Sequence, residues 1–118
     1  MEKLFWEKEY TITTNSLDCY DRLSLVGILD LLQDAAGYHA TLLGLGFDDL
    51  KEIGITWLLV RTKIEIIKEL PSIKKVKVKT WQSYKGRVDY ERDYLICDEN
   101  DEVLIKGTSK WCLIETLT

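Results

Sequence analysis

The hydrophobic residues of this chain follow two different periods. Residues 5–14 alternate, with Trp6, Tyr10 and Ile12 on one side and Glu7 and Glu9 on the other, a pattern typical of a β-strand. Beyond residue 24 the apolar positions recur every three or four residues, which predicts a long α-helix with one buried side. The predicted buried stripe consists of Leu25, Ile28, Leu29, Leu32, Ala35, Ala36, His39, Leu42 and Leu43.

Polar residues and glycines mark the ends of this helix. Asp21 and Ser24 are both suited to cap its N-terminus. Gly44 and Gly46 are expected to end it, because glycine adopts the left-handed backbone conformation that other residues resist. A short second helix is expected over residues 47–53.

From Ile55 onward the period is two, which predicts strands separated by turns. In one of these strands Val76 and Val78 face one way and three lysines face the other, so one side is exposed to solvent. The predicted strands cover residues 55–67, 74–81, 88–97 and 103–114, with turns at residues 84–87 and 98–101.

One strand, one long helix and about four further antiparallel strands define an α+β layout. A single helix cannot cover both sides of such a sheet. The simplest arrangement is therefore an antiparallel sheet wrapped around one long central helix, although other α+β folds share the same periods.

Size and composition predict one domain that spans residues 1–118. A chain of 118 residues buries roughly two-thirds of its unfolded surface, so its core needs no disulfide or metal. The formal net charge of −4 and the lack of a basic stripe interleaved with aromatic residues argue against nucleic acid as a partner. No apolar run approaches the roughly 18 to 20 residues that span a bilayer, and no apolar signal region is present, so we expect a cytoplasmic protein.

Cysteine usage agrees with a reduced compartment. Cys19, Cys97 and Cys112 are widely spaced and form no CxxC pattern that would bind a metal. A nucleophilic cysteine would need a base nearby, and His39 is the only histidine. Inert, partly buried cysteines are the commoner case.

Several spaced motifs run from about Phe5 to the last residue. They are Leu23-Ser24-Leu25, Leu32-Gln33-Asp34-Ala35-Ala36-Gly37-Tyr38-His39-Ala40, Leu43-Gly44, Gly54-Ile55-Thr56-Trp57-Leu58-Leu59-Val60-Arg61, Thr80-Trp81, Arg92-Asp93-Tyr94 and Thr108-Ser109-Lys110-Trp111-Cys112-Leu113-Ile114. Together they resemble the first hot-dog repeat of the acyl-acyl carrier protein thioesterases. The resemblance implies a hot-dog fold and hydrolysis of the thioester between a fatty acyl chain and the phosphopantetheine arm of acyl carrier protein. It implies no metal or organic cofactor.

In this family two such domains usually lie in tandem, and the second carries an Asn-x-His-x-Asn-Asn type motif at the start of its helix. Where that motif would align, this chain reads Asp18-Cys19-Tyr20-Asp21-Arg22-Leu23-Ser24-Leu25, with neither the asparagine nor the histidine. Two classes of function follow: a thioester hydrolase, or a non-catalytic module that binds acyl thioesters or a partner. We expect a homodimer, because a second copy would replace the tandem repeat and cover the open edges of the sheet.

Hydrolysis needs a donor for the developing oxyanion and a group that takes a proton from water. The free N–H groups at the start of the predicted helix could supply the donor. The candidates for the base are Asp18 and Asp21 before the helix, Gln33 and Asp34 in its middle, and His39 near its end. The alternatives are helix capping for Asp18 and Asp21, and a hydrogen-bonded core residue for His39.

Two further groups of residues are candidates for substrate binding. Trp57 and Arg61 share a face of the predicted strand, where they could contact the pantetheine arm; packing and a solvated guanidinium are the alternative. Lys75, Lys77 and Lys79 form a basic patch that could dock an acidic carrier protein. The alternative for the lysines is an edge strand that they keep soluble and unpaired.

Overall fold

The computed structural model describes residues 5–12, 24–68 and 75–115, and contains two helices and a five-stranded sheet. The sheet order is β1-β3-β4-β5-β2, and every neighbouring pair is antiparallel. The elements are β1 (Phe5–Thr11), α1 (Leu25–Leu42), α2 (Phe47–Lys51), β2 (Ile55–Ile66), β3 (Lys75–Lys85), β4 (Asp89–Cys97) and β5 (Val103–Glu115).

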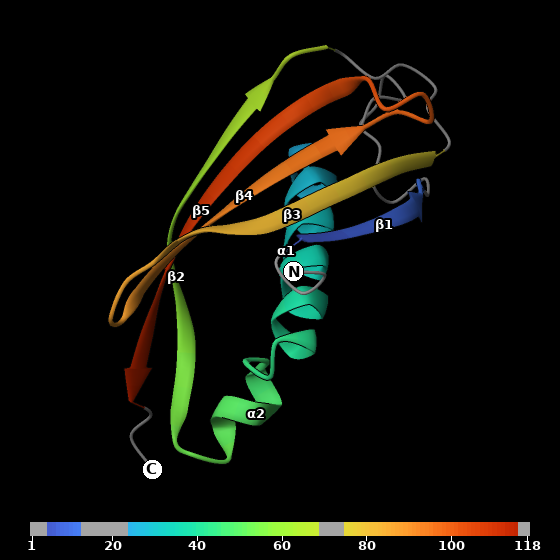
Figure 1. Cartoon of the computed structure of the whole chain (residues 1–118). Helices are drawn as coiled ribbons and strands as arrows, with labels where there is room; N and C mark the ends of the chain where they lie inside the picture. The colour runs from blue at the N-terminus through green and yellow to red at the C-terminus, as the bar shows by residue number, and fades with distance from the viewer. Residues whose placement is uncertain (1–4, 13–23, 69–74, 116–118) are drawn as a thin grey trace.

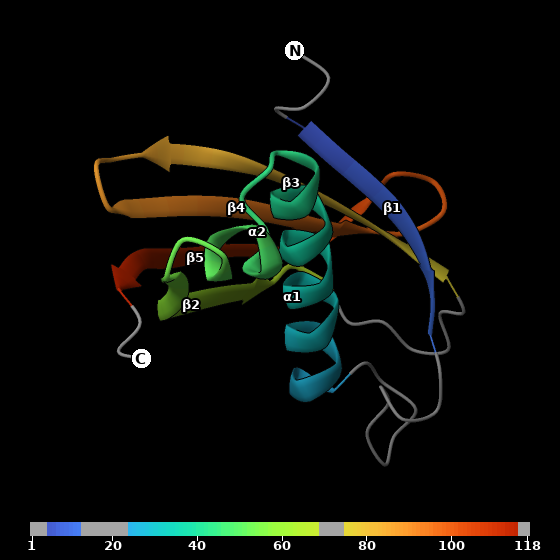
Figure 2. The same ribbon diagram turned by 90° about the horizontal axis from the view of Figure 1, so that it is seen from below.

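The sheet is curved, and α1 lies in its concave face (Figure 1). Seen from below, α1 crosses in front of the strands, with α2 beside its C-terminal end (Figure 2). The approach of helix to sheet is close at Gly107, where an added Cβ atom would lie 3.1 Å from Cδ1 of Leu32. The predicted α+β fold, with an antiparallel sheet around one central helix, is confirmed.

Local chemistry sets the ends of α1 as the sequence predicts. The Ser24 side chain caps the helix by accepting a hydrogen bond from the backbone N–H of Gly27 at 3.0 Å. Gly44 has a φ of 78°, in the left-handed region that favours glycine. Asp21, the other candidate cap, lies outside the described residues.

The buried side of α1 differs in part from the predicted stripe. Ile28, Leu32, Ala35, Ala36 and His39 are buried as predicted, and Leu31 is buried as well. Leu25, Leu29 and Leu42 are exposed, contrary to the prediction. The predicted stripe is wider than the side of α1 that is buried in the structure.

The core lies between α1 and the concave face of the sheet. It includes Val76, Val78, Tyr94, Ile96 and Ile105, with Trp6 and Tyr10 of β1 packed at its margin. As the alternation predicts, the lysines of β3 are on the opposite face. No helix in the described ranges is long and apolar enough to cross a membrane.

The strand β3 is longer than predicted. Tyr84 and Lys85 were expected in a turn, but they pair with Glu91 and Tyr90 of β4. A register shift between Gln82 and Tyr84 allows this pairing to continue past the point where the alternation breaks.

Candidate active site

A cavity of about 530 Å³ opens between α1, α2 and the concave face of the sheet. Its volume falls within the range of about 300 to 1,000 Å³ that small-ligand sites occupy. The helix contributes Gln33, Asp34 and Gly37 to its wall. An added Cβ atom on Gly37 would have no neighbour within 4 Å, so the glycine leaves open space at this wall.

Aromatic side chains from three strands form one wall of the cavity. The Trp57 ring meets the Tyr90 ring edge to face, with centroids 4.9 Å apart, and lies 6.4 Å from the Trp111 ring. The Trp57 indole N–H donates to the carbonyl of Leu45 at 2.8 Å, and that of Trp111 donates to Ser109 Oγ at 2.7 Å. Because both N–H groups have acceptors, the rings present an apolar surface to the cavity.

A buried polar cluster lies beside this wall. Arg92 lines the cavity yet is only 6% exposed, and its Nη1 donates to His39 Nδ1 at 2.6 Å and to Thr80 Oγ1 at 3.3 Å. Thr80 in turn donates to the backbone carbonyl of Asp93 at 3.0 Å. Burial lowers the pKa of Arg92 from its usual value.

The contact with Arg92 defines the state of His39. A guanidinium only donates, so Nδ1 of His39 must accept, and the imidazole is neutral with its proton on Nε2. His39 is 0% exposed and is not part of the cavity wall. A base role for His39 would require the hydrogen bond from Arg92 to open.

Asp34 is held at the other side of the cavity by β1. The Tyr10 hydroxyl donates to Asp34 Oδ2 at 2.6 Å, and the other carboxylate oxygen has no hydrogen bond within the described ranges. Burial, then the hydrogen bond and charge of Asp34, raise the pKa of Tyr10, so the phenol stays protonated and remains a donor. Trp6 stacks on Tyr38 one turn further along α1, with ring centroids 5.9 Å apart.

The structure therefore brings together part of the predicted site. Gln33, Asp34 and Trp57 line one cavity, and His39 lies behind Arg92. Asp18 and Asp21 lie outside the described residues. Arg61, Lys75, Lys77 and Lys79 do not line the cavity.

The predicted shared face of Trp57 and Arg61 is wrong. The pairing of β2 with β5 shifts register between Leu59 and Arg61, so Trp57 pairs with Leu113, whereas Arg61 pairs with Lys110. One extra residue moves every later side chain to the other face of the strand. Trp57 consequently points to the cavity, while Arg61 is exposed on the opposite side of the sheet.

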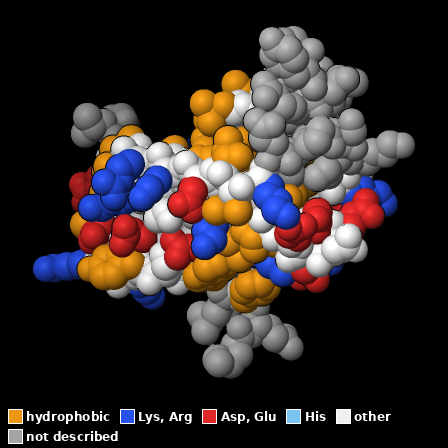
Figure 3. Space-filling model, turned by 90° about the horizontal axis from the view of Figure 1, so that it is seen from above, with side chains coloured by type: hydrophobic (Ala, Val, Ile, Leu, Met, Phe, Trp, Pro, Cys, Tyr) orange, Lys and Arg blue, Asp and Glu red, His pale blue; other side chains and the backbone are white. Residues whose placement is uncertain are grey.

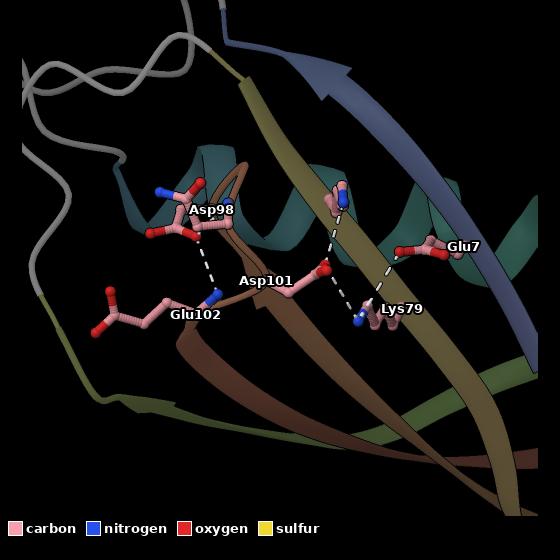
Figure 4. A network of polar contacts seen from close by, with 7 residues as sticks. Glu7, Lys79, Asp98, Asp101 and Glu102 are labelled. Atoms are coloured by element: carbon pink, nitrogen blue, oxygen red, sulfur yellow. Dashed lines mark hydrogen bonds and ion pairs between the residues drawn. The ribbon is translucent and has the colours of Figure 1, made fainter.

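The lysines of β3 do not belong to an edge strand, because β3 lies between β1 and β4. That alternative is therefore wrong. Figure 4 shows Lys79 between Glu7 and Asp101, at 3.9 and 3.5 Å. Lys77 contacts Asp101 at 3.1 Å, and Lys75 contacts Glu9 at 3.6 Å. Figure 3 shows basic and acidic side chains interspersed on this face, so the patch is largely neutralised.

The residues that sequence reasoning missed are Tyr90, Arg92 and Trp111. Arg92 belongs to a motif of the resemblance, but no role was assigned to it. The alternation of the strand places Arg92 on the same face as Tyr90 and Tyr94, and this was the signal that an arginine faces the interior.

The two cysteines in the described ranges add no nucleophile to this site, and Cys19 lies outside those ranges. Cys97 and Cys112 are free, and neither lines the cavity. Burial raises the pKa of the Cys97 thiol, which disfavours the reactive thiolate. Among the described residues, no group of three or more His, Cys, Asp or Glu side chains is placed to hold a metal ion.

The architecture is that of the hot-dog thioesterases. DHNA-CoA thioesterase from Staphylococcus aureus superposes with a TM-score of 0.87 at 21% identity, over 97% of this chain and 76% of that chain. An acyl-ACP thioesterase from Bacteroides thetaiotaomicron superposes with a TM-score of 0.88 at 27% identity, over 97% of this chain and 47% of that chain.

The sequence identifies the family within this class. Residues 3–118 match the model of the acyl-ACP thioesterase N-terminal domain, so the chain belongs to the acyl-ACP thioesterase family. The oleoyl-acyl carrier protein thioesterase of Coriandrum sativum is 32% identical over 94 residues, which cover 74% of this chain and 26% of the relative. The chain thus spans about a quarter of the length of that relative.

Proposed function

We propose that this chain hydrolyses fatty acyl thioesters of acyl carrier protein, and that acyl-CoA is an alternative substrate. The observation that carries the proposal is a cavity of about 530 Å³ with an aromatic wall on one side and the carboxylate of Asp34 on another. An acyl chain against Trp57, Tyr90 and Trp111 would bury apolar surface, which stabilises the complex. Membership in the family supports the thioester as the reacting group.

Asp34 is our candidate for the general base. Its Oδ2 accepts the hydrogen bond from Tyr10, which leaves the other oxygen able to accept a proton from water. The water oxygen would attack the acyl carbon, the thiolate would leave, and the proton would pass to the departing sulfur. Gln33 could orient the water. Asp18, Asp21 and His39 remain predictions from the sequence.

We also propose a homodimer. The strand β2 is at one edge of the sheet, and two of its own residues, Leu58 and Val60, are 49% and 52% exposed. An edge strand that carries exposed apolar residues is normally covered by another chain or element. Light scattering at micromolar concentration should give the mass of two chains, and a monomeric mass would contradict this proposal.

Incubation with dodecanoyl-acyl carrier protein and with dodecanoyl-CoA tests the proposed reaction. Release of free thiol, followed in a thiol assay, is expected with the carrier-protein substrate and more slowly with the CoA substrate. Saturable binding of either thioester without thiol release would favour the alternative, a non-catalytic acyl-binding module. A cytoplasmic location remains a prediction.

A further inference from the structure

Arg92 is a buried cation whose charge no described residue balances. It is 6% exposed, and it has no ion pair with a carboxylate in the described part of the chain. Its hydrogen-bond partners, His39 and Thr80, are neutral. Buried charges in proteins are ordinarily paired or fully hydrogen bonded, because an isolated charge loses its hydration on burial.

The hydrogen bonds of Arg92 leave donors available. A guanidinium carries five N–H donors in a planar fork. Both hydrogen bonds of Arg92 start from Nη1, whereas Nε and Nη2 have no acceptor among the described residues. The residue lines the cavity, so a molecule in the cavity can supply an acceptor oxygen.

An acceptor oxygen bound by Arg92 would lie near the aromatic wall of the cavity. Tyr90 precedes Arg92 by two residues on the same face of β4, which corresponds to about 7 Å along the strand. Gln82, the cross-strand partner of Arg92, also lines the cavity. An apolar chain packed on the aromatic wall would therefore have a polar end close to Gln82 and Arg92.

We propose that Arg92 binds the carbonyl oxygen of the acyl group through its Nε and Nη2 donors. The proposal rests on the proposed function, since it takes an acyl thioester as the ligand. Every such thioester carries a carbonyl oxygen next to its apolar chain. The same guanidinium would face that oxygen as it becomes negatively charged during attack by water, when a fixed donor stabilises it most.

Acidic residues of the cavity favour a neutral carbonyl over an anionic ligand. Asp30, Asp34 and Glu91 line the cavity, and none of them forms an ion pair with Arg92. A ligand carboxylate would meet their repulsion, whereas an uncharged carbonyl would not.

Two matched ligands that cannot be hydrolysed test the proposal without turnover. Both are based on S-dodecanoyl-N-acetylcysteamine: in the ketone analogue a methylene replaces the sulfur, and in the thioether analogue a methylene replaces the carbonyl. Trp57 and Trp111 line the cavity, so tryptophan fluorescence reports binding. The wild type should bind the ketone about tenfold more tightly than the thioether, as a hydrogen bond from a charged donor predicts.

The variant Arg92→Met should bind the two analogues equally, and Arg87→Met, an exposed arginine away from the cavity, should keep the tenfold ratio. Equal binding of the two analogues by the wild type would overturn the proposal, even if Arg92→Met does not fold. A tenfold ratio that persists in folded Arg92→Met would overturn it as well. Absence of thiol release from dodecanoyl-acyl carrier protein, together with an Arg92-dependent ratio, would contradict the proposed hydrolysis alone.

Discussion

The two faces of the sheet follow the same alternation but satisfy their polar groups in different ways. On the concave face, Arg92 and Thr80 are buried against His39 of α1, and Arg92 hydrogen bonds to both. On the opposite face, the lysines of β3 form ion pairs of 3.1 to 3.9 Å in contact with solvent. Loss of a buried hydrogen bond leaves a polar group without water, so it costs stability, whereas surface ion pairs contribute little to the free energy of folding.

The largest expected effect is on turnover. Asp34→Asn removes the proposed base but keeps an oxygen that can accept from Tyr10, so the rate of thiol release should fall by about 100-fold or more. Asp48 is exposed on α2 and does not line the cavity. The matched variant Asp48→Asn should therefore release thiol at the wild-type rate. Wild-type turnover in Asp34→Asn would remove Asp34 from the reaction.

The next effect is on stability. His39→Ala deletes a fully buried side chain and removes one of the two acceptors of Arg92 Nη1, so the free energy of unfolding should fall by about 3 kcal/mol. Gln33→Ala, on an exposed part of the same helix, should change it by less than about 0.5 kcal/mol. Urea unfolding measures both, and equal stability of His39→Ala and the wild type would contradict the buried network.

A smaller effect appears at alkaline pH. The pKa of Tyr10 is raised in the folded state, chiefly by burial, so above about pH 10 the folded chain retains a proton that the unfolded chain loses. Stability should therefore fall as the pH rises above about 10, and Tyr10→Phe should reduce this fall.

Tyr94 provides an internal reference for that measurement. Burial raises its pKa too, so part of the alkaline loss should persist in Tyr10→Phe. Thermal unfolding at about pH 8 and about pH 11 measures the loss of stability for the wild type and for Tyr10→Phe. An identical loss in both would show that Tyr10 does not contribute.

The smallest effect is expected on the opposite face. Replacing Lys75, Lys77 and Lys79 by glutamine removes the patch without adding carboxylates beside Glu7, Glu9 and Asp101. Because the patch is already largely neutralised, reaction with acyl-acyl carrier protein should slow by about tenfold, the low end of electrostatic steering, and reaction with acyl-CoA should change less.

Salt provides the control for this prediction. The Debye length falls from about 10 Å at 0.1 M to about 3 Å at 1 M, so the difference between variant and wild type should disappear at high salt. Equal rates at low salt, or equal losses with both substrates, would assign these lysines to the solvated surface alone.

The fold was predictable because each of its elements has a clear period. The switch from a helical period to a period of two separates α1 from the strands, and Ser24 and Gly44 carry signals for the ends of the helix. The end of β3 was not predictable in the same way, because a register shift hides the pairing of Tyr84 and Lys85.

The site was less predictable, and β2 shows why. Leu58, Leu59 and Val60 are consecutive apolar residues, so no alternation reveals the irregularity that follows Leu59 and places Arg61 on the opposite face from Trp57. Asp34 was identified from the predicted helix, and Trp57 was identified from the predicted strand. That they share a cavity depends on tertiary packing, which local periods do not contain.

The central claim is that an acyl chain occupies the cavity beside α1, and filling the cavity tests it directly. Gly37 lines the cavity and has open space around it, so Gly37→Phe should fold normally and place a ring where the chain would lie. Lys51→Phe adds the same ring at an exposed position of α2. Fluorescence titration with the ketone analogue should give binding at least about tenfold weaker for Gly37→Phe, as expected when a buried apolar contact is lost, and unchanged for Lys51→Phe. Wild-type affinity in a folded Gly37→Phe variant would contradict the claim.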